Sequence, residues 1–566
     1  MPAIGVTVFK GMRRAVSPLL LDSAEGVEAK NCDVRTGRVE PIKAPAVSTT
    51  APDGSVKVAP VRGNWVFFGH DASVALATDY GTDPKFYYIN RDADPDSTDS
   101  YPRQAKLSGY PTTTYRLGVP APDSPLSITL NGTASGDAPL YTVSYVYTYV
   151  TEWGHEGAPS PPTGVIDVYD GQYITLTGLS LPSDYSEYGI IGYRIYRLAA
   201  GTTGAEYMLV PVLEAMTYYG QTLVVPSNLT SATDKLSTEP NLIPLTDLGE
   251  VLPTEDFAHP PKGMTDIIAT STGFYVGARG TELYCSEPLY PYAWPVAYVQ
   301  RTEFPIVALA YSGNVIFALT EGPPYFFTGT APSAMSRRRL PYFDPCLSRD
   351  GVVSTVYGAI FPSYDGLILL STTGERKVVT ETHLTREQWG EYDLPNLCGA
   401  FYKGAYVGFF RGSTGGFMFD LESGTLVELD LPFGGSTIEA VTTDDKTGKL
   451  YVLTSDMNVY EFEAGTTHMN YTWRSKVFAI ERGAAISSGL VRIDSTTTSG
   501  NLTITIEADG TTVKSRSVEI PPGRLTHDVF RLPASYASRW SFVLSGNVPV
   551  DRVVLATSMM EVGSFG

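Results

Sequence analysis

The residue types that most often carry out catalysis or bind metals are sparse and scattered in this sequence. Its six histidines are His70, His155, His259, His383, His468 and His527, and no two of them stand four residues apart. The chain contains no HExxH, GxSxG, Walker-type or GxGxxG motif, the local signatures of zinc hydrolases, serine hydrolases and nucleotide sites. We therefore interpret each histidine as a core or surface residue, and we predict no catalytic residue, no metal, no cofactor and no enzymatic activity.

One acidic segment has the spacing of a cation site. The segment DADPDSTD at 92–99 places Asp92, Asp94 and Asp96 at alternate positions, as in a calcium loop. Such a loop also needs glycine at its sixth position and glutamate at its twelfth, where this chain has Ser97 and Arg103. We interpret the segment as a solvated acidic loop, with a weak cation site as the alternative.

A second segment partly matches a turn found in sialidase-like glycosidases. Their turn reads S-x-D-x-G-x-x-W, whereas SYDGLILL at 363–370 has its glycine one place early and no tryptophan. Hydrolysis of a glycosidic bond needs two facing carboxyl groups, and no local pattern points to such a pair. A glycosidase is the least favoured alternative.

Two other clusters have the chemistry of contact surfaces. Arg337, Arg338 and Arg339 form a dense basic run that suits either DNA phosphates or an acidic neighbouring subunit, and we favour the subunit interface. The segment SEPLYPYAWP at 286–295 concentrates Tyr290, Tyr292 and Trp294 among prolines, which fix an extended loop. Its aromatic side chains fill either an intersubunit or interblade pocket or simply the local core.

The elements that must position these residues are β-strands. The 566 residues are 43% hydrophobic and 18% charged, with 36 tyrosines, 23 phenylalanines, 54 glycines and 41 prolines. Aromatic residues favour pleated surfaces while glycine and proline mark turns, so the composition predicts an all-β protein and excludes a disordered chain or a coiled coil. The net charge of −19 repels nucleic acid over most of the surface but permits DNA to pass through a pore.

Targeting and redox signals are absent. No apolar run is long enough for a membrane span, and the N-terminal residues have no hydrophobic region typical of a secretory signal. Four cysteines stand far apart without a CxxC pair: Cys32, Cys285, Cys346 and Cys398. We expect free, mostly buried thiols in a reducing cytosol.

A strand–turn–strand pattern repeats after residue 264. Five segments share it with starts about 40–50 residues apart, the period of a four-stranded propeller blade: 267–286, 306–329, 358–380, 398–420 and 438–463. Residues 55–90 have the same layout. We predict a β-propeller of about six blades, with the hairpins of a large sandwich as the alternative.

Other segments interrupt this repeat. Alternating tyrosines from Tyr141 to Tyr149 and the segment YRIYR at 193–197 favour an inserted β-sandwich similar to fibronectin type III domains. Prolines in 115–122 and 222–262 indicate linkers. The predicted domains are an N-terminal arm (1–50), a first propeller segment (51–115), the inserted sandwich (116–245), the remaining blades (246–465) and a C-terminal β-sandwich (466–566). The arm either embraces a neighbouring subunit or closes the propeller sheet.

An ordered series of short motifs resembles the tail nozzle, or tail hub, proteins of short-tailed bacteriophages (podoviruses). The motifs are NCDVRTGRVEPI (31–42), YRLGVPAP (115–122), YTYVTEWGHEGAPSPP (147–162), YRIYR (193–197), LYCSEPLYPYAWP (283–295), residues 306–329, PSYDGLILLS (362–371) and WRSKVF (473–478). Together they span most of the chain.

The resemblance implies a structural virion protein made in the host cytoplasm. Such proteins form a homohexameric ring below the tail adaptor, conduct DNA through the central channel during ejection, dock tail fibres or spikes, and are closed by a needle or plug. The resemblance supplies no catalytic residues. An adhesion or receptor-binding tail component that recognises a cell-surface glycan is the main alternative.

Overall fold

The chain is almost entirely β-structure. The computed structural model describes residues 3–77, 82–201, 204–218, 220–444, 446–495 and 499–564. Besides short 3₁₀ turns, helix in these residues is limited to α1 (Tyr185–Tyr188), α2 (Arg386–Trp389) and α3 (Met559–Ser564). The predicted all-β class is confirmed. None of the helices in the described residues has the length and hydropathy needed to cross a membrane.

The chain divides into two compact units. The first unit comprises Met1–Asp71, Ala310–Phe326 and Arg338–Gly566, and the second comprises Ala72–Leu309 and Phe327–Arg337. All four cysteines are free, with buried side chains, as the sequence predicted. Burial raises the pKa of Cys285 to about 12 and that of Cys398 to about 11, so both thiols stay protonated and unreactive at neutral pH.

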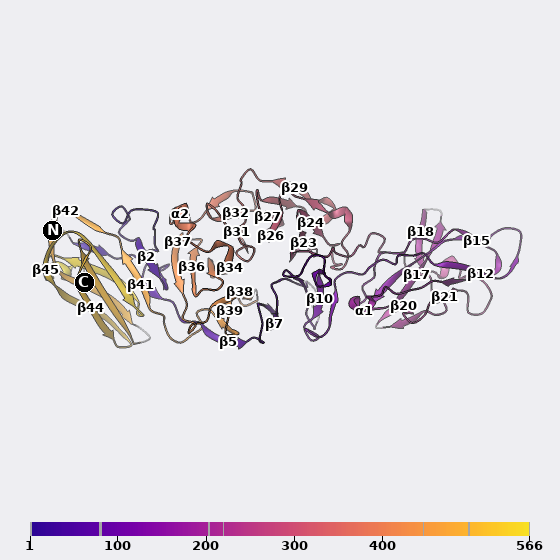
Figure 1. Ribbon diagram of the computed structural model, residues 1–566, viewed down its shortest axis with the longest axis horizontal. Helices are drawn as coiled ribbons and strands as arrows, with labels where there is room; N and C mark the ends of the chain where they lie inside the picture. Colours follow the sequence, from indigo (N-terminus) through magenta and orange to yellow (C-terminus); the bar gives the residue numbers. More distant parts are fainter. Residues whose placement is uncertain are drawn as a thin grey trace. The chain divides into compact units, whose positions relative to one another are not determined.

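Each of the five repeat segments forms three consecutive strands of an antiparallel sheet, to which a fourth strand is added (Figure 1). Tight turns join the strands; between β34 and β35, for example, Lys403 and Gly404 both have positive φ, as a two-residue hairpin requires. The strands of the first three sheets are β22 (Asp266–Ala269), β23 (Tyr275–Arg279), β24 (Glu282–Cys285) and β25 (Gln300–Arg301); β26 (Ile306–Ser312), β27 (Val315–Thr320), β28 (Tyr325–Thr328) and β29 (Ser336–Arg339); and β30 (Val353–Thr355), β31 (Gly358–Ser363), β32 (Gly366–Ser371) and β33 (Arg376–Val378).

The last two repeats belong to the first unit. They are β34 (Leu397–Tyr402), β35 (Ala405–Phe410), β36 (Gly415–Asp420) and β37 (Thr425–Asp430), and β38 (Ile438–Asp444), β39 (Lys449–Thr454) and β40 (Asn458–Glu461). The fourth strand of the final sheet is β5 (Ala46–Thr50), which pairs antiparallel with β40. Within its own chain, β5 of the predicted N-terminal arm therefore adds the fourth strand to a sheet whose other strands come about 400 residues later.

The segment 55–90 does not form one sheet, which corrects that part of the sequence interpretation. Its first part is the hairpin β6 (Lys57–Val61) and β7 (Asn64–Phe68), which belongs to the first unit. Its second part contributes β8 (Ala72–Leu76) and β9 (Lys85–Asn90) to a four-stranded sheet of the second unit, together with β10 (Arg103–Lys106) and β11 (Thr114–Arg116). The bend at Gly69 and His70 ends the pairing of the first hairpin. The turn at 81–84 is only partly within the described residues.

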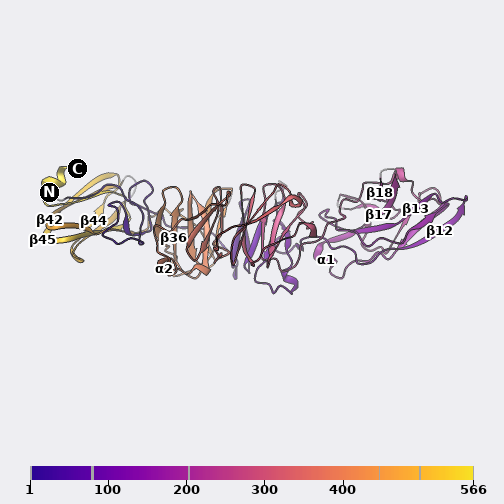
Figure 2. The same cartoon turned by 90° about the horizontal axis from the view of Figure 1, so that it is seen from above.

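The C-terminal residues form long strands that include both ends of the chain in one sheet. They are β41 (Tyr471–Ser475), β42 (Phe478–Ser495), β43 (Gly500–Ala508), β44 (Thr511–Ile520), β45 (Arg524–Gly546) and β46 (Val550–Ala556). Figure 2 shows β42, β44 and β45 in yellow beside the N and C labels. The N-terminal strand β1 (Ile4–Val6) pairs with β46, and β2 (Gly26–Lys30) pairs with β41 and, in parallel, with β37.

The inserted segment has two main antiparallel sheets around one apolar core. One sheet contains β12 (Ser127–Ser135), β16 (Asp170–Thr177) and β21 (Ser231–Asp234). The other contains β14 (Tyr145–Thr151), β17 (Ile190–Gly201), β18 (Gly204–Leu209), β19 (Met216–Tyr218) and β20 (Gln221–Pro226), and a small pair is formed by β13 (Tyr141–Val143) and β15 (Ile166–Val168). The alternating tyrosines Tyr145, Tyr147 and Tyr149 are buried in this core.

The linker predicted at 222–262 begins too early. Residues up to Asp234 form β20 and β21, which belong to the two sheets of the inserted segment. Pro226 lies at the end of β20, where its missing N–H costs no interior ladder bond. The prolines therefore mark a strand end there, and the proline-rich connection follows β21.

Candidate functional site

The predicted basic run forms an exposed edge strand. Arg337, Arg338 and Arg339 lie on β29, at the end of its sheet, and all three side chains are exposed. Arg337 donates a hydrogen bond to the carbonyl of Arg301, and Arg338 donates one to the carbonyl of Thr373 at 3.0 Å. A carbonyl oxygen orients a guanidinium without neutralising its charge. These two arginines are thus anchored by carbonyl oxygens, and their side chains remain exposed.

The aromatic loop 286–295 is divided between core and surface. Trp294 is 2% exposed and donates its indole N–H to the carbonyl of Pro291 at 2.8 Å, and Tyr292 is 9% exposed. Tyr290 is 44% exposed, and its ring centroid lies 5.3 Å from that of Phe257. Trp294 and Tyr292 therefore pack mainly within their own unit, whereas Tyr290 keeps a large free surface.

Tyr292 stacks on a histidine to which sequence reasoning gave no role. The rings of His155 and Tyr292 have centroids 4.1 Å apart and planes 17° apart. The His155 ring is buried, and its Nδ1 has no hydrogen-bond partner. Burial, with a smaller effect from the positive charges of Lys85 and Lys106, lowers the pKa of His155 to about 3. The imidazole is consequently neutral at physiological pH.

The loop that carries His155 is fixed by the adjacent glutamate. The buried carboxylate of Glu156 accepts hydrogen bonds from Thr148 Oγ1 (2.6 Å), Tyr196 Oη (2.7 Å) and Arg194 Nη1 (2.8 Å). Thr148 lies on β14, and Arg194 and Tyr196 lie on β17. Two of the motifs quoted from the sequence, WGHEG and YRIYR, therefore meet in space, and their contact sets the position of His155.

A cavity of about 380 Å³ opens beside His155 within the second unit. Its walls come from β9, the loop 153–155, the residues around β23 and the aromatic loop, and they include Lys85, Trp153, Tyr290 and Tyr292. The only local signal for it in the sequence is the Trp–Gly–His group itself, because the other wall residues are distant along the chain.

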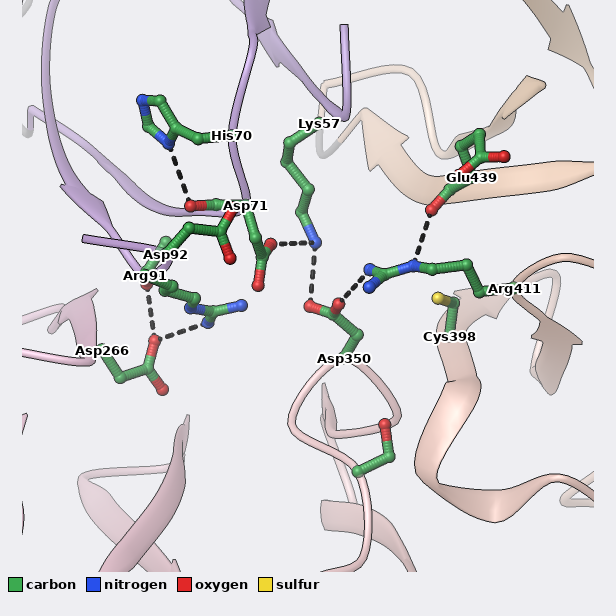
Figure 3. A network of polar contacts seen from close by, with 12 residues as sticks. Lys57, His70, Asp71, Arg91, Asp92, Asp266, Asp350, Cys398, Arg411 and Glu439 are labelled. Atoms are coloured by element: carbon green, nitrogen blue, oxygen red, sulfur yellow. Dashed lines mark hydrogen bonds and ion pairs between the residues drawn. The ribbon is translucent and has the colours of Figure 1, made fainter. Parts of the chain in front are cut away.

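In the first unit, a network of ion pairs connects several sheets and loops (Figure 3). Lys57 on β6 and Arg411 after β35 both reach Asp350, each at 2.8 Å, and Arg411 also donates to the carbonyl of Glu439 at 3.0 Å. Lys57 lies 3.8 Å from Asp71. These pairs join the hairpin β6–β7, the loop before β30, and the sheets of β35 and β38, so we read them as structural cross-links.

A comparable carboxylate stands in the second unit. The buried Asp266, at the start of β22, accepts hydrogen bonds from Ser73 Oγ (2.5 Å) and the backbone N–H of Leu309 (2.7 Å), and it pairs with Arg91 at 3.0 Å (Figure 3). Its donors come from β8, from β26 and from the end of β9. This carboxylate ties neighbouring sheets together and has no open side for a substrate.

The two carboxylate patterns considered from the sequence lie in an exposed loop and in an ion-paired turn. Among the described residues, no group of three histidine, cysteine or acidic side chains is arranged to hold a metal ion, and Asp92, Asp94 and Asp96 are exposed. Asp365, in the turn compared with sialidase-like proteins, pairs with Arg376 at 3.1 Å and Arg386 at 3.6 Å.

Comparisons with known proteins return only distant structural similarity. No protein-family model matches the chain, and no curated protein sequence matches it. The Dos1 propeller aligns over 75% of this chain and 96% of its own, at 11% identity and a TM-score of 0.28. Glutaminyl cyclase from Myxococcus xanthus aligns over 34% and 85% (15% identity, TM-score 0.21), and an exo-β-1,3-galactanase from Phanerochaete chrysosporium with galactose over 90% and 99% (10%, 0.18). TM-scores this low carry no argument about function.

Proposed function

We propose that this chain is a structural protein of a short-tailed bacteriophage tail. In this proposal six copies form the ring-shaped nozzle below the tail adaptor, DNA passes through its channel during ejection, and tail fibres or spikes dock on its rim. A needle or plug closes the tip, and the protein is made in the host cytoplasm. The order of the sequence motifs and the repeated antiparallel sheets support this role.

The fold proposed for each subunit is a β-propeller of about six blades. Four-stranded antiparallel sheets recur along the chain, and β5 from the N-terminal arm supplies the last strand of the final sheet. Completion of one sheet by strands from both ends of the repeat is an efficient way to fasten a ring of blades. The inserted two-sheet segment and the C-terminal strands are then accessory domains available for contacts with other tail proteins.

The observation that carries the proposal is the exposed arginine strand in a strongly acidic chain. A ring of identical subunits needs a heterologous contact, in which one patch meets a different patch of the next copy. The strand β29 presents three exposed arginines in a protein whose net charge is −19. The exposed loop with Asp92, Asp94, Asp96 and Asp99 has the opposite charge that such a contact requires.

The test compares two triple variants with the same change in net charge. In the first, Arg337, Arg338 and Arg339 are replaced by alanine; in the control, the exposed Lys43, Lys377 and Lys446 are replaced. We expect the arginine variant to stay folded but to reduce assembly of infectious particles by about tenfold or more, because every contact around the ring loses three cations. The control should assemble normally, and raised salt should imitate the arginine variant.

Cryo-electron microscopy of particles containing the chain then reports the role directly. Six copies around a channel at the tail tip are the expected result. Density at the periphery of the particle, or normal assembly of the arginine variant, would contradict the proposal.

A further inference from the structure

The second unit also contains a larger cavity, of about 910 Å³, whose lining residues are mostly apolar. Its walls come mainly from three segments that are distant in sequence: the connection after β11, the proline-rich connection before β22, and the residues from β24 to β25. Small-molecule sites have this form, in which apolar walls surround a few polar groups that fix the ligand. Most of the charged groups in this cavity are carboxylates.

The carboxylates select the charge of the ligand. Asp123, Glu255 and Asp256 line the cavity and are exposed. Within the part of the chain that the structure describes, no hydrogen bond or ion pair engages their side chains. Glu282 also lines the cavity, but it is already paired with Arg301 at 2.7 Å. The lining therefore keeps an excess of negative charge, which attracts a cation.

The placement of these carboxylates selects an extended ligand. Among the described residues, no group of three histidine, cysteine or acidic side chains is arranged to hold a metal ion. Glu255 and Asp256 are adjacent in the chain, whereas Asp123 belongs to the connection after β11. One ligand that pairs with all three therefore has to carry several positive charges, separated by a spacer.

The apolar walls select the nature of that spacer. Val296 is 76% exposed, and Val299 and Tyr284 are partly exposed, so all three side chains are accessible from the cavity. Methylene chains pack along such surfaces while their charged ends stay in water or beside a counter-charge. A compact inorganic cation would leave these walls in contact with water. An alkyl spacer between ammonium groups therefore fits the cavity best.

We propose that this cavity binds a linear polyamine. Its ammonium groups face Asp123, Glu255 and Asp256, and its methylene segments pack on Val296 and Val299. An arginine-rich peptide carries similar charges, but it would also bring backbone amides into a mostly apolar hollow, where each needs a hydrogen-bond partner. The site lies within one unit of a single chain, so the proposal does not depend on ring assembly.

The first experiment measures binding of spermidine to the full chain by calorimetry. The buffer contains about 0.15 M salt, so that attraction to dispersed surface charges is largely screened. The comparison probes are Mg²⁺ and triarginine, which has the same net charge as spermidine. We expect saturable binding of spermidine, with Mg²⁺ and triarginine binding at least about tenfold more weakly.

Three results would overturn the proposal. The first is the absence of saturable spermidine binding at millimolar concentration. The second is equal affinity for Mg²⁺ and spermidine, which would make the cavity a site for positive charge alone. The third is binding of triarginine as tight as that of spermidine, or tighter, which would assign the cavity to a segment of a partner protein.

The second experiment locates the binding with two double variants that remove the same charge. Glu255→Gln combined with Asp256→Asn should weaken spermidine binding by about tenfold or more. The control combines Glu239→Gln with Asp247→Asn, because both residues are exposed and lie outside the cavity. Equal losses in the two variants would show that spermidine follows the overall charge of the chain, which contradicts the proposal. Circular dichroism melting curves verify that each variant is folded.

The third experiment tests the apolar wall without changing any charge. Val296→Ser removes apolar surface on which the methylene segments pack, and it should weaken spermidine binding by about threefold. Val165→Ser is the control, because Val165 is 65% exposed and lies outside the cavity. If Val296→Ser binds spermidine as tightly as the natural chain does, the alkyl spacer makes no contact with this wall and the polyamine assignment is wrong.

Discussion

Two buried polar sites in the inserted segment differ in how completely they are paired. In the first, Arg197 and Asp234 are each 0% exposed and their charged groups lie 2.8 Å apart. Asp234 also accepts from Tyr145 Oη (2.7 Å) and from the backbone N–H of Ile243 (3.2 Å), and Arg197 donates to the carbonyl of Ile243 (2.7 Å). In the second, the His155 ring is buried with Nδ1 unpaired.

The difference separates a cluster whose hydrogen bonds hold two sheets together from a ring nitrogen that forms no hydrogen bond in the fold. The Asp234 cluster joins β14, β17 and β21, and so connects the two sheets of the segment. Burial raises the pKa of Tyr145, with a contribution from the Asp234 charge, so the phenol remains a donor. Arg197 Nε alone lacks a partner in this cluster. His155 packs its ring against Tyr292 but leaves Nδ1 without a hydrogen bond, and a buried unpaired polar atom lowers the stability of the fold.

The largest expected effect comes from breaking the paired site. Asp234→Ala leaves the guanidinium of Arg197 buried without its counter-charge, and we expect a loss of about 3–5 kcal/mol in the stability of the inserted segment. Hydrogen exchange followed by mass spectrometry on the full chain should show faster exchange in β14, β17 and β21.

Asp247→Ala is the matched control, because Asp247 lies on the surface near the same segment. Its expected change is within about 0.5 kcal/mol. Unchanged protection in Asp234→Ala would mean that the buried pair contributes nothing to the fold, and the comparison would fail.

The second prediction uses pH to test the unpaired site. The pKa of His155 in the folded chain, about 3, is below its ordinary value of 6.5, so the unfolded chain binds a proton over the interval in which the folded chain does not. Stability is therefore lost as the pH falls from about 6.5 towards 3. Against His155→Phe, which has no such proton, the natural chain should lose about 2 kcal/mol between pH 7 and pH 5.

Urea unfolding of both chains at the two pH values measures this difference. His383 and His468 also have lowered pKa values because of burial, but they are present in both chains and cancel in the comparison. A gap between the two chains that stays constant from pH 7 to pH 5 would show that the pKa of His155 is not lowered by folding.

The sequence predicts elements far better than it predicts these sites. Strand alternation and turn glycines are local, and the five repeat segments appear as strands where they were expected. The arginine run can also be recognised from the sequence alone, since its three residues are adjacent. The cavity needs the loop at His155 to meet Tyr292, more than 130 residues later, and no local pattern encodes that contact. No local pattern encodes the pairing of β5 with β40 either, because the two strands lie about 400 residues apart in the chain.

The prolines after residue 222 show the limit of composition as a guide. A proline such as Pro226 marks either a linker or the end of a strand, and only the pairing partner decides between them. The pairing of β20 with β17, and of β21 with β16, depends on residues 30 to 60 positions earlier. Tertiary contacts therefore decided the boundary that local residue types left open.

The smallest expected effect sharpens the comparison by removing one bond from the paired site. Tyr145→Phe preserves the buried ring and deletes only the hydroxyl that donates to Asp234. A hydrogen bond to a charged group contributes about 1.5–3 kcal/mol, and Asp234 keeps its other two donors, so we expect a loss near the lower end, about 1–2 kcal/mol. Hydrogen exchange in β14 and β21 measures this loss.

Tyr149→Phe is the control for a bond between neutral groups, because it removes a hydroxyl bonded to the carbonyl of Ser180 at 2.8 Å. This variant should lose about 1 kcal/mol or less. If both variants lose the same amount, the charge of Asp234 adds nothing to the bond. Arg197 and the Ile243 amide would then satisfy the Asp234 carboxylate without help from Tyr145. In that case the number of hydrogen bonds would not explain why this site stabilises the fold and the His155 site does not.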